Sequence, residues 1–440
     1  MAGLDTMVNV RDIERAARRR LPRPIYDVVA GGAWDEVTLN ANEADLRQLR
    51  MRCRTLVDVG ERDLSTTVLG HPVALPVLLA PVGYQRMLHR HAELAAARAA
   101  ATAGTIFACN TISSYPLEDV AAASDGPKWF QLYMPGDRGE AEQLLARVEQ
   151  ASYPVLCLTV DTAMSGMRER DIRNRMTQPL RIDPRMVLAA ARRPRWALDF
   201  LRGGVGRGLT PTPRLPMSIK DAGRAIAKAG RPVTFSDLQW LRERWRGKLV
   251  VKGVLRGDDA AKIVDHGVDG IVISNHGGRQ LDSSPSTISV LPEISDAVAG
   301  RAEVFIDGGF RRGTDVAKAL ALGARAVLIG RPFLYGLAAG GQQGVERVLD
   351  ILRHELDTAL GLLGCTSVEA LDGSFVAASG EPTGAGRGST APTGAPSRDA
   401  SVDLQATYPP QSTRHDGARS TTFLDEPRTR GSNPDRPEGP

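Results

Sequence analysis

One segment of the sequence concentrates residue types that can do acid–base chemistry, SNHGGRQLD at positions 274–282. His276 ends an apolar run, a place that suits proton transfer, because an imidazole gains or loses a proton near neutral pH. Arg279 follows three residues later and suits a carboxylate, which a guanidinium binds with two parallel hydrogen bonds. The segment therefore predicts a base beside an anion-binding group.

Polar residues at the ends of two other apolar runs could complete this site. Asp161 could orient His276 and stabilise its cationic form, as a carboxylate does for other histidine bases. Arg168 could be a second clamp for a carboxylate. Gln131 and Tyr133 add an amide and a phenol. Together these side chains predict one ring of polar groups.

Glycine and arginine occur together in two further places, DGGFRRG at 307–313 and GRP at 330–332. Glycine lets the main chain approach an anion closely, and Arg311 and Arg331 supply positive charge. We expect these two segments to bind a phosphate group. Lys252 stands inside an otherwise apolar run, where an amino group is costly unless an anion meets it.

These residues stand at the ends of short apolar runs, most of which are followed by a helical pattern. Continuous apolar runs of this length are typical of parallel strands buried on both faces. The runs occupy residues 77–81, 105–110, 129–133, 155–161, 249–253, 270–276, 304–309 and 326–331. Helical patterns between them include residues 93–103, 139–151, 258–266 and 313–322.

The repeat predicts an α/β fold, and a closed (β/α)8 TIM barrel is favoured over an open doubly wound sheet. No GxGxxG string follows the first run, and the polar residues collect at the carboxyl ends of the runs. Barrel enzymes place their active sites at that rim, and the loops after strands seven and eight commonly bind phosphate. Residues 307–313 and 330–332 occupy those two loops.

Two stretches depart from the repeat. About 85 residues separate the fourth run from the fifth, which predicts a long insertion after strand four. Its basic and aromatic residues 190–208 suit a lid, a packing insertion or contact with anionic lipid. From about residue 380, Gly, Pro, Ser and Thr dominate, and such a segment cannot offset its chain entropy. We expect a barrel domain at 8–378 and a disordered tail at 379–440.

Composition excludes several classes of protein. The net charge is +5, but its arginines alternate with acidic residues, which favours a solvated surface over a nucleic-acid interface. No apolar stretch is long enough for a spanning helix, and the N-terminus lacks the apolar core of a signal peptide. We expect a cytoplasmic protein, and contact of residues 190–208 with the inner face of the cell membrane is an alternative to a lid or packing role. The four cysteines are far apart, so neither disulfides nor a metal site are expected.

Taken together, these strings resemble the FMN-dependent α-hydroxy-acid dehydrogenase/oxidase family, from about Asp12 to about Leu371. The most specific strings are LTVDT (158–162), VKGV (251–254), SNHGGRQLD (274–282), DGGFRRGTDV (307–316) and ALGARAVLIGRPFLYGLAAGG (321–341). The resemblance implies FMN as cofactor and oxidation of an L-2-hydroxy acid, L-lactate or a similar acid, to the 2-oxo acid. It also implies an electron acceptor, a quinone or oxygen, and a homo-oligomer, a tetramer.

The resemblance also implies roles for individual residues. His276 would be the base and Asp161 its partner, Arg168 and Arg279 would bind the carboxylate, and Tyr26 and Tyr133 would touch the substrate. Lys252 would lie near the flavin pyrimidine. The remaining flavin-ring contacts would be Ala80, Pro81, Val82, Asn110, Gln131, Thr159 and Ser274. Contacts to the ribityl chain and phosphate would be Asp307, Gly308, Gly309, Arg311, Gly330 and Arg331.

The sequence departs from the family pattern at residues 162–167, at Asn110 and at Ile112, so the substrate stays open. Gly83 follows the first strand, where dehydrogenases of the family tend to have Gly and oxidases Ala. This favours a dehydrogenase, with a peroxide-producing oxidase as the alternative. A peptide-modifying enzyme and a catalytically silent FMN-binding protein are further alternatives, which the complete ring of His276, Arg168 and Arg279 disfavours.

Overall fold

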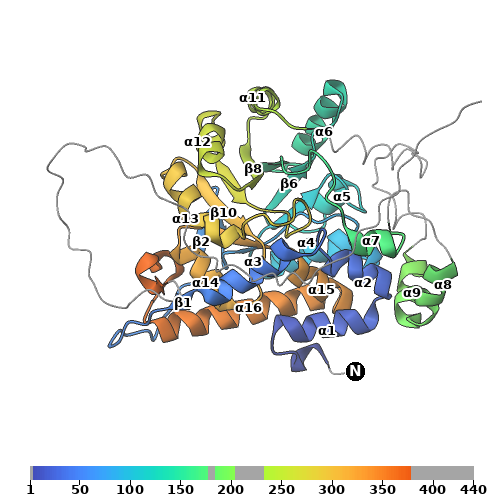
Figure 1. Cartoon of the computed structure of the whole chain (residues 1–440), viewed down its shortest axis with the longest axis horizontal. Helices are drawn as coiled ribbons and strands as arrows, with labels where there is room; N and C mark the ends of the chain where they lie inside the picture. The colour runs from blue at the N-terminus through green and yellow to red at the C-terminus, as the bar shows by residue number, and fades with distance from the viewer. Residues whose placement is uncertain (1–2, 177–183, 204–231, 378–440) are drawn as a thin grey trace, which may run out of the picture. The chain divides into compact units, whose positions relative to one another are not determined.

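The computed structural model describes residues 3–176, 184–203 and 232–377 (Figure 1). Its centre is a closed barrel of eight parallel strands, and Leu328 of the last strand pairs with Leu78 of the first. All eight apolar runs therefore form strands, which confirms the predicted barrel. The strands are β4 (Val77–Leu79), β5 (Phe107–Asn110), β6 (Lys128–Leu132), β7 (Val155–Thr159), β8 (Lys248–Val254), β9 (Gly270–Ile273), β10 (Glu303–Asp307) and β11 (Ala326–Ile329).

Helices surround the strands, and each strand-to-strand connection carries at least one. The four helical patterns expected from the sequence lie in α4, α6, α12 and α14. The helices that follow the strands are α4 (Ala92–Thr102), α5 (Leu117–Ala121), α6 (Arg138–Gln150), α11 (Phe235–Arg244), α12 (Gly257–Asp265), α13 (Thr287–Val298), α14 (Gly313–Ala321) and α15 (Arg331–Gly340).

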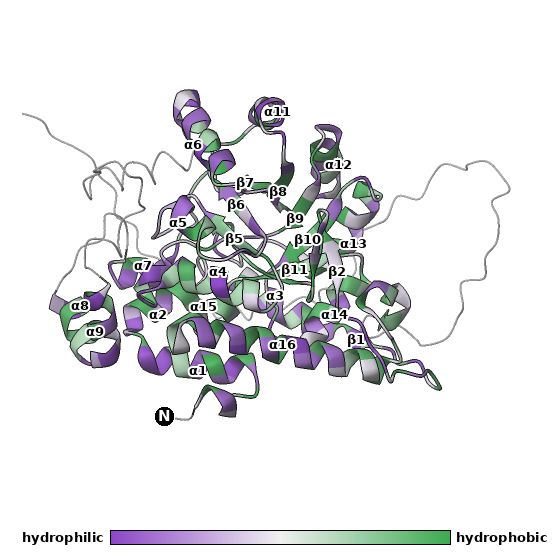
Figure 2. Cartoon of the chain, turned by 180° about the vertical axis from the view of Figure 1, so that it is seen from behind, coloured by the Kyte–Doolittle hydropathy of each residue, from purple (hydrophilic) through white to green (hydrophobic). Residues whose placement is uncertain are grey.

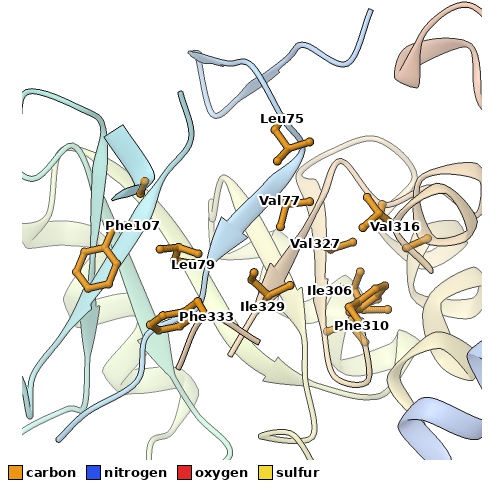
Figure 3. Packing of buried hydrophobic residues seen from close by; sticks show 14 of the residues in the cluster. Leu75, Val77, Leu79, Phe107, Ile306, Phe310, Val316, Val327, Ile329 and Phe333 are labelled. Atoms are coloured by element: carbon orange, nitrogen blue, oxygen red, sulfur yellow. The ribbon is translucent and has the colours of Figure 1, made fainter. Parts of the chain in front are cut away.

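Side chains along each strand point alternately outward and inward, so the strands contribute to two hydrophobic cores. Val77 and Leu79 point outward and pack in the layer between strands and helices, which Figure 3 shows. Leu78, between them, belongs to the cluster inside the barrel. There the rings of Trp129 and Phe305 meet edge to face, with centroids 5.2 Å apart. Filled on both sides, the strands form a rigid frame for the polar residues at their ends.

A hairpin that the sequence reading missed closes one end of the barrel. It consists of β2 (Thr66–Val68) and β3 (His71–Val73), which pair antiparallel just before β4. Val68, Leu69 and Val73 join the inner cluster of the barrel. Because the hairpin leads into the amino end of β4, it leaves the carboxyl ends of the strands for the polar residues.

The N-terminal segment and the last long helix pack outside the barrel (Figure 1). The long helix, α16, contacts α14, α15 and α4, and α1 packs on α15. A short pairing of β1 with β12 joins residues 50–51 to residues 376–377. These elements are α1 (Val10–Arg20), α2 (Arg23–Ala30), α3 (Val37–Gln48), β1 (Arg50–Met51), α16 (Gln342–Leu363) and β12 (Val376–Ala377).

The predicted insertion lies between β7 and α11. Its described parts are α7 (Glu169–Arg173), α8 (Pro184–Ala191) and α9 (Pro194–Arg202), and α8 packs on α9. Residues 204–208 of the segment expected at a lipid surface, and the expected tail at 379–440, lie outside the described residues. Among the helices that the structure describes, none has the length and apolar character needed to cross a bilayer.

Candidate active site

His276 and Asp161 meet at the carboxyl end of the barrel, from the loops after β9 and β7. Nδ1 of His276 lies 3.0 Å from one carboxylate oxygen of Asp161 and 3.1 Å from the other. Burial would raise the pKa of Asp161, but its interaction with His276 and the charge of Lys252 outweigh it and hold that pKa below its usual range. Asp161 is therefore an anion that fixes the proton on Nδ1, which leaves Nε2 for proton transfer.

The main chain holds this pair in an unusual conformation. His276 has φ of 57°, a left-handed value that is costly for a residue with a side chain. Its amide donates to the Ser274 hydroxyl at 3.1 Å, which helps to keep the turn. Gly253 has φ of 110°, and a Cβ there would lie 2.6 Å from the Cβ of Asp161. Only glycine at the end of β8 thus lets Asp161 approach the imidazole.

Arg168 and Arg279 stand beside the pair as a cationic site, and the charge of Asp171 on α7 acts on both without an ion pair. Arg279 donates to the carbonyls of Val28 at 2.8 Å and Gly31 at 2.9 Å, which fixes its guanidinium. Burial, then the charges of Arg168 and Arg331, lower the pKa of Arg279 to about 9. No carboxylate of the described residues lies within ion-pair distance of either arginine. Such a site is stabilised by an anionic ligand.

Lys252 lies buried at the end of β8 and is paired rather than free. Its Nζ lies 2.9 Å from Asp307 Oδ2 and 2.6 Å from Ser274 Oγ. Burial would lower the pKa of Lys252, but Asp307 and Asp161 outweigh it and raise that pKa. The lysine therefore stays charged at the centre of the strand ends.

Two buried side-chain amides at the ends of β5 and β6 have polar atoms without hydrogen-bond partners in the described structure. This is expected where a polar ring such as a flavin binds. Gln131 donates to the Thr159 hydroxyl at 2.8 Å, and its Oε1 has no partner within the described structure. Both side-chain polar atoms of Asn110 are also buried and unpartnered there. Unpaired buried groups are costly, so a ligand with donors and acceptors fits this place. The flavin ring has both.

The loops after β10 and β11 fit a phosphate. Gly309 has φ of 88°, and a Cβ there would lie 2.1 Å from the carbonyl oxygen of Asn42 on α3. Arg331 starts α15 and donates to the carbonyls of Val29, Gly277 and Gly31 at 2.8–3.0 Å. The amino end of α15 and this fixed guanidinium together favour an anion. Arg311 is less free, because it pairs with Glu43 at 3.1 Å.

The segment after β4 supplies the remaining expected flavin contacts. Ala80 is held by a hydrogen bond from its amide to the carbonyl of Ile329 at 2.9 Å. Pro81 and Val82 follow at the rim, and Gln85 donates to the Val82 carbonyl at 2.9 Å. These bonds fix the main chain of residues 80–82 beside the start of α15.

The structure treats the two expected substrate tyrosines differently. Burial and then Asp161 raise the pKa of Tyr133 to about 12, so its phenol stays protonated in the site. Tyr26, in contrast, donates to Glu14 Oε1 of α1 at 2.9 Å, and its ring stacks on Tyr335 at 6.2 Å. No contact within the described residues brings Tyr26 into the ring around His276. Tyr84, which the sequence reading did not name, has a buried and unpartnered hydroxyl.

Comparison with known proteins identifies the family. The model of the family described as FMN-dependent dehydrogenase matches residues 17–378. The chain belongs to this family. It is 43% identical to L-lactate oxidase of a Nostoc species over 383 residues, 86% of this chain and 100% of that protein. It is 44% identical to L-lactate dehydrogenase of Caulobacter vibrioides over 372 residues, 83% of this chain and 96% of that protein.

Solved structures agree with the fold of the FMN-dependent dehydrogenase family. A monotopic membrane protein, (S)-mandelate dehydrogenase, matches with a TM-score of 0.81 at 38% identity, over 85% of this chain and 100% of that one. A mandelate oxidase matches with a TM-score of 0.72 at 39% identity, over 83% and 97%. The predictions of the family, the barrel and FMN as cofactor are therefore confirmed.

The residues described above are suited to hold FMN. Asn110, Gln131 and Thr159 would face its ring, Lys252 would supply positive charge, and the loop at 308–309 with Arg331 would hold its phosphate. FMN, when bound, takes up the two electrons that an oxidation releases. The imidazole of His276 lies in the same ring of residues and can accept a proton.

Proposed function

We propose that this enzyme oxidises a short L-2-hydroxy acid, L-lactate or a close analogue, to the 2-oxo acid. The observation that carries the proposal is the His276–Asp161 hydrogen bond beside two arginines without carboxylate partners. The substrate carboxylate binds between Arg168 and Arg279, and Nε2 of His276 accepts one proton of the substrate. The two electrons, together with the second hydrogen that the oxidation removes, would pass to FMN. Asp161 stabilises the resulting imidazolium. L-Lactate enzymes among the relatives support the substrate class.

A panel of substrates tests this proposal. L-Lactate, D-lactate, glycolate and L-mandelate are each incubated with the yellow enzyme and a dye acceptor, and the 2-oxo acid is quantified. We expect an L-2-hydroxy acid to give stoichiometric 2-oxo acid and its D-enantiomer to give none. Failure of every 2-hydroxy acid to yield product would contradict the proposal.

For the electron acceptor we propose a quinone. Gly83 supports this, because it leaves the position after β4 without a side chain. Dehydrogenases of the family tend to have Gly at this position, whereas oxidases tend to have Ala. An oxidase is the second candidate, favoured by the full-length match to an L-lactate oxidase. Reduced enzyme should reoxidise slowly in air and quickly with a soluble quinone analogue. Rapid, stoichiometric production of hydrogen peroxide would instead assign the oxidase.

We also propose that α8 and α9 contact an anionic membrane surface. Their exposed apolar residues are Val187, Leu188, Leu198 and Leu201, with exposed fractions of 49–61%. Exposed arginines accompany them, and Figure 2 shows hydrophobic and hydrophilic residues on both helices. A solved relative that is described as a monotopic membrane protein supports the proposal. The exposed arginines are Arg185, Arg192, Arg193, Arg195 and Arg202.

Sedimentation with vesicles tests the membrane contact. Vesicles that contain phosphatidylserine should bind the enzyme at low salt, and binding should weaken at high salt or with Leu198→Ser/Leu201→Ser. Leu362→Ser on α16 is the matched control, because Leu362 is 73% exposed but lies on another helix. Equal vesicle binding by both variants, or no binding by the wild type, would contradict the membrane contact and leave α8 and α9 with a packing role.

A further inference from the structure

Gln280, the residue after Arg279, has a buried side-chain amide that takes no part in the proposed proton transfer or carboxylate binding. Its Nε2 donates to the carbonyl of Asp161 at 2.7 Å and to the carbonyl of Met164 at 2.8 Å. Its Oε1 accepts from the amide of Gly166 at 3.2 Å. A carbonyl only accepts and a main-chain amide only donates, so these partners fix the orientation of the side chain.

The partners of Gln280 are spaced along residues 161–168, the segment after β7 that we call the 161–168 loop. The loop begins with Asp161, which pairs with His276, and ends with Arg168. None of its residues belongs to a helix or a strand, so the regular hydrogen bonds of secondary structure do not hold it. Such a segment opens easily unless side chains fix it. One amide therefore ties down a loop with two residues of the site.

The 161–168 loop also lies directly on the main chain that carries Arg279. A Cβ built on Gly166 would lie 2.4 Å from the carbonyl oxygen of Arg279 and 2.8 Å from Cα of Gln280, which is too close for any side chain. Arg168 crosses the same contact. Its Nε donates to the Arg279 carbonyl at 3.5 Å, and its Nη2 donates to Oε1 of Gln280 at 3.5 Å. The loops after β7 and β9 thus meet along Gln280.

We propose that Gln280 is a positioning residue that sets the place of the 161–168 loop for both proton transfer and carboxylate binding. This inference rests on the proposed oxidation of a 2-hydroxy acid. Gln280 acts through two other residues. Its bond to the carbonyl of Asp161 holds that carboxylate against His276, and its Oε1 orients Arg168. A displacement of about 1 Å in a reacting group can slow a reaction about a hundredfold, so one amide can control both functions.

Gln280→Met tests the inference, because methionine is of similar length but makes no strong hydrogen bond. We expect the rate of flavin bleaching by saturating L-lactate to fall by about 10- to 100-fold per bound FMN. Affinity for oxalate, a non-reacting dicarboxylate, should fall by about tenfold, read from the change in the yellow absorbance of the oxidised holoenzyme. A role in folding alone would lower FMN content or unfolding temperature and leave both values unchanged.

Gln239→Met is the matched control for this substitution. Gln239 is exposed on α11, and its amide donates to Glu243 at 3.3 Å, away from the site. The bleaching rate and the affinity for oxalate should stay those of the wild type in this variant.

Gln280→Glu separates the contact with Arg168 from the contacts with the loop carbonyls. The introduced carboxylate can accept from the amide of Gly166 but cannot donate to the carbonyls, and it neutralises Arg168. Oxalate should therefore bind about tenfold more weakly in Gln280→Glu than in Gln280→Met. Equal affinity in the two variants would overturn the part of the inference that concerns Arg168.

Gly166→Ala attacks the same contact from the loop. Its Cβ would displace the 161–168 loop and leave Gln280 intact, so it should reproduce the losses of Gln280→Met. It carries the test if Gln280→Met yields no holoenzyme. Wild-type bleaching rate and oxalate affinity in the variant that carries the test would overturn the inference. With a wild type active on L-lactate, that result leaves the proposed function intact. A wild type that neither binds oxalate nor oxidises any 2-hydroxy acid would remove both.

Discussion

Three partly buried guanidinium groups, those of Arg168, Arg279 and Arg331, lie close together at the mouth of the barrel. Most of their acceptors are main-chain carbonyls, which orient the groups without neutralising them. Burial and the charges of Arg168 and Arg331 lower the pKa of Arg279, and burial and the charge of Arg311 lower the pKa of Arg331. This charge is stabilised when anions bind, and the enzyme has two to bind, a substrate carboxylate and the phosphate of FMN.

Replacement of Arg279 by lysine tests this at a single residue. Lysine keeps the charge but cannot bond to the carbonyls of Val28 and Gly31 and still offer a planar pair of donors. We expect Arg279→Lys to raise KM for L-lactate at least about tenfold, with FMN content unchanged. Arg325→Lys is the control, because Arg325 is 42% exposed and pairs with Glu369. Equal kinetics in both variants would contradict a role in substrate binding.

Among the structural elements, the carboxyl ends of the strands position the site residues. The segment after β4 is closely packed against the segment after β5. A Cβ built on Gly83 would lie 2.5 Å from Cγ1 of Ile112 and 2.7 Å from its Cδ1. Gly83 and Ile112 therefore form a steric pair across the ends of β4 and β5. Any change of side-chain volume at residue 83 must therefore include residue 112.

Because oxidases of the family tend to have Ala at this position, we expect Gly83→Ala to increase reaction with oxygen, and the contact with Ile112 refines that expectation. Alone, Gly83→Ala should displace Ile112. We expect this overpacking to lower the free energy of unfolding by about 1–3 kcal/mol, or to lower FMN content. Gly83→Ala/Ile112→Ala should relieve the clash and raise the rate of reoxidation by air above that of Ile112→Ala alone. Stopped-flow reoxidation of the reduced enzyme measures this. Identical rates in those two variants would show that residue 83 does not control access of oxygen.

A buried acid in α4 predicts a pH dependence of stability. Burial raises the pKa of Glu93 to about 7, although its Oε1 accepts from the amide of Ser114 at 3.0 Å. The folded state therefore binds a proton that the unfolded chain releases, and stability falls as pH rises from about 4.5 to about 7. Over this range the free energy of unfolding should fall less in Glu93→Gln than in the wild type, and the difference should be on the order of 1–3 kcal/mol.

Thermal unfolding at pH 5 and pH 8 checks this prediction. The difference in unfolding temperature between the two pH values should be smaller for Glu93→Gln than for the wild type. Glu243→Gln is the control, because Glu243 is exposed and should leave the difference unchanged. If Glu93→Gln shows the same difference in unfolding temperature between pH 5 and pH 8 as the wild type, Glu93 does not titrate in this range.

The sequence was sufficient for the elements that depend on local pattern. Apolar runs predicted the eight strands, and the carboxyl ends of parallel strands meet, so Asp161 and His276 could be paired from their places in the chain. The role implied for Tyr26 stays a prediction, because the direction of its hydroxyl depends on the packing of α1 on α2, where it donates to Glu14. Tyr84 was missed because a left-handed residue after a strand leaves no pattern in the sequence.

At the scale of the whole molecule, the first and last described segments are joined. β1 pairs with β12, and Phe375, which is only 2% exposed, packs beside them. Residues 378–440 lie beyond this pairing and outside the described structure. The expected tetramer also belongs to this scale and stays a prediction. Light scattering of the holoenzyme should give about four times 47.2 kDa.

Truncation at two points tests where the folded domain ends. Removal of residues 380–440 should leave flavin content, turnover and unfolding temperature unchanged, because that segment has too few apolar residues to add a core. Removal of residues 372–440 also deletes Phe375 and β12, and should lower the unfolding temperature by several degrees. Loss of soluble protein in the shorter deletion would show that the tail packs on the barrel.

The most direct test of the central claim is anaerobic reduction of the bound FMN by L-lactate, followed by stopped-flow absorbance in wild type and His276→Gln. We predict rapid bleaching of the wild type. Bleaching should be slower by about 10²- to 10⁴-fold in His276→Gln, because this variant keeps a side chain of similar size and retains FMN but loses the base. Equal rates in the two proteins would contradict the assignment of His276 as the base in this oxidation.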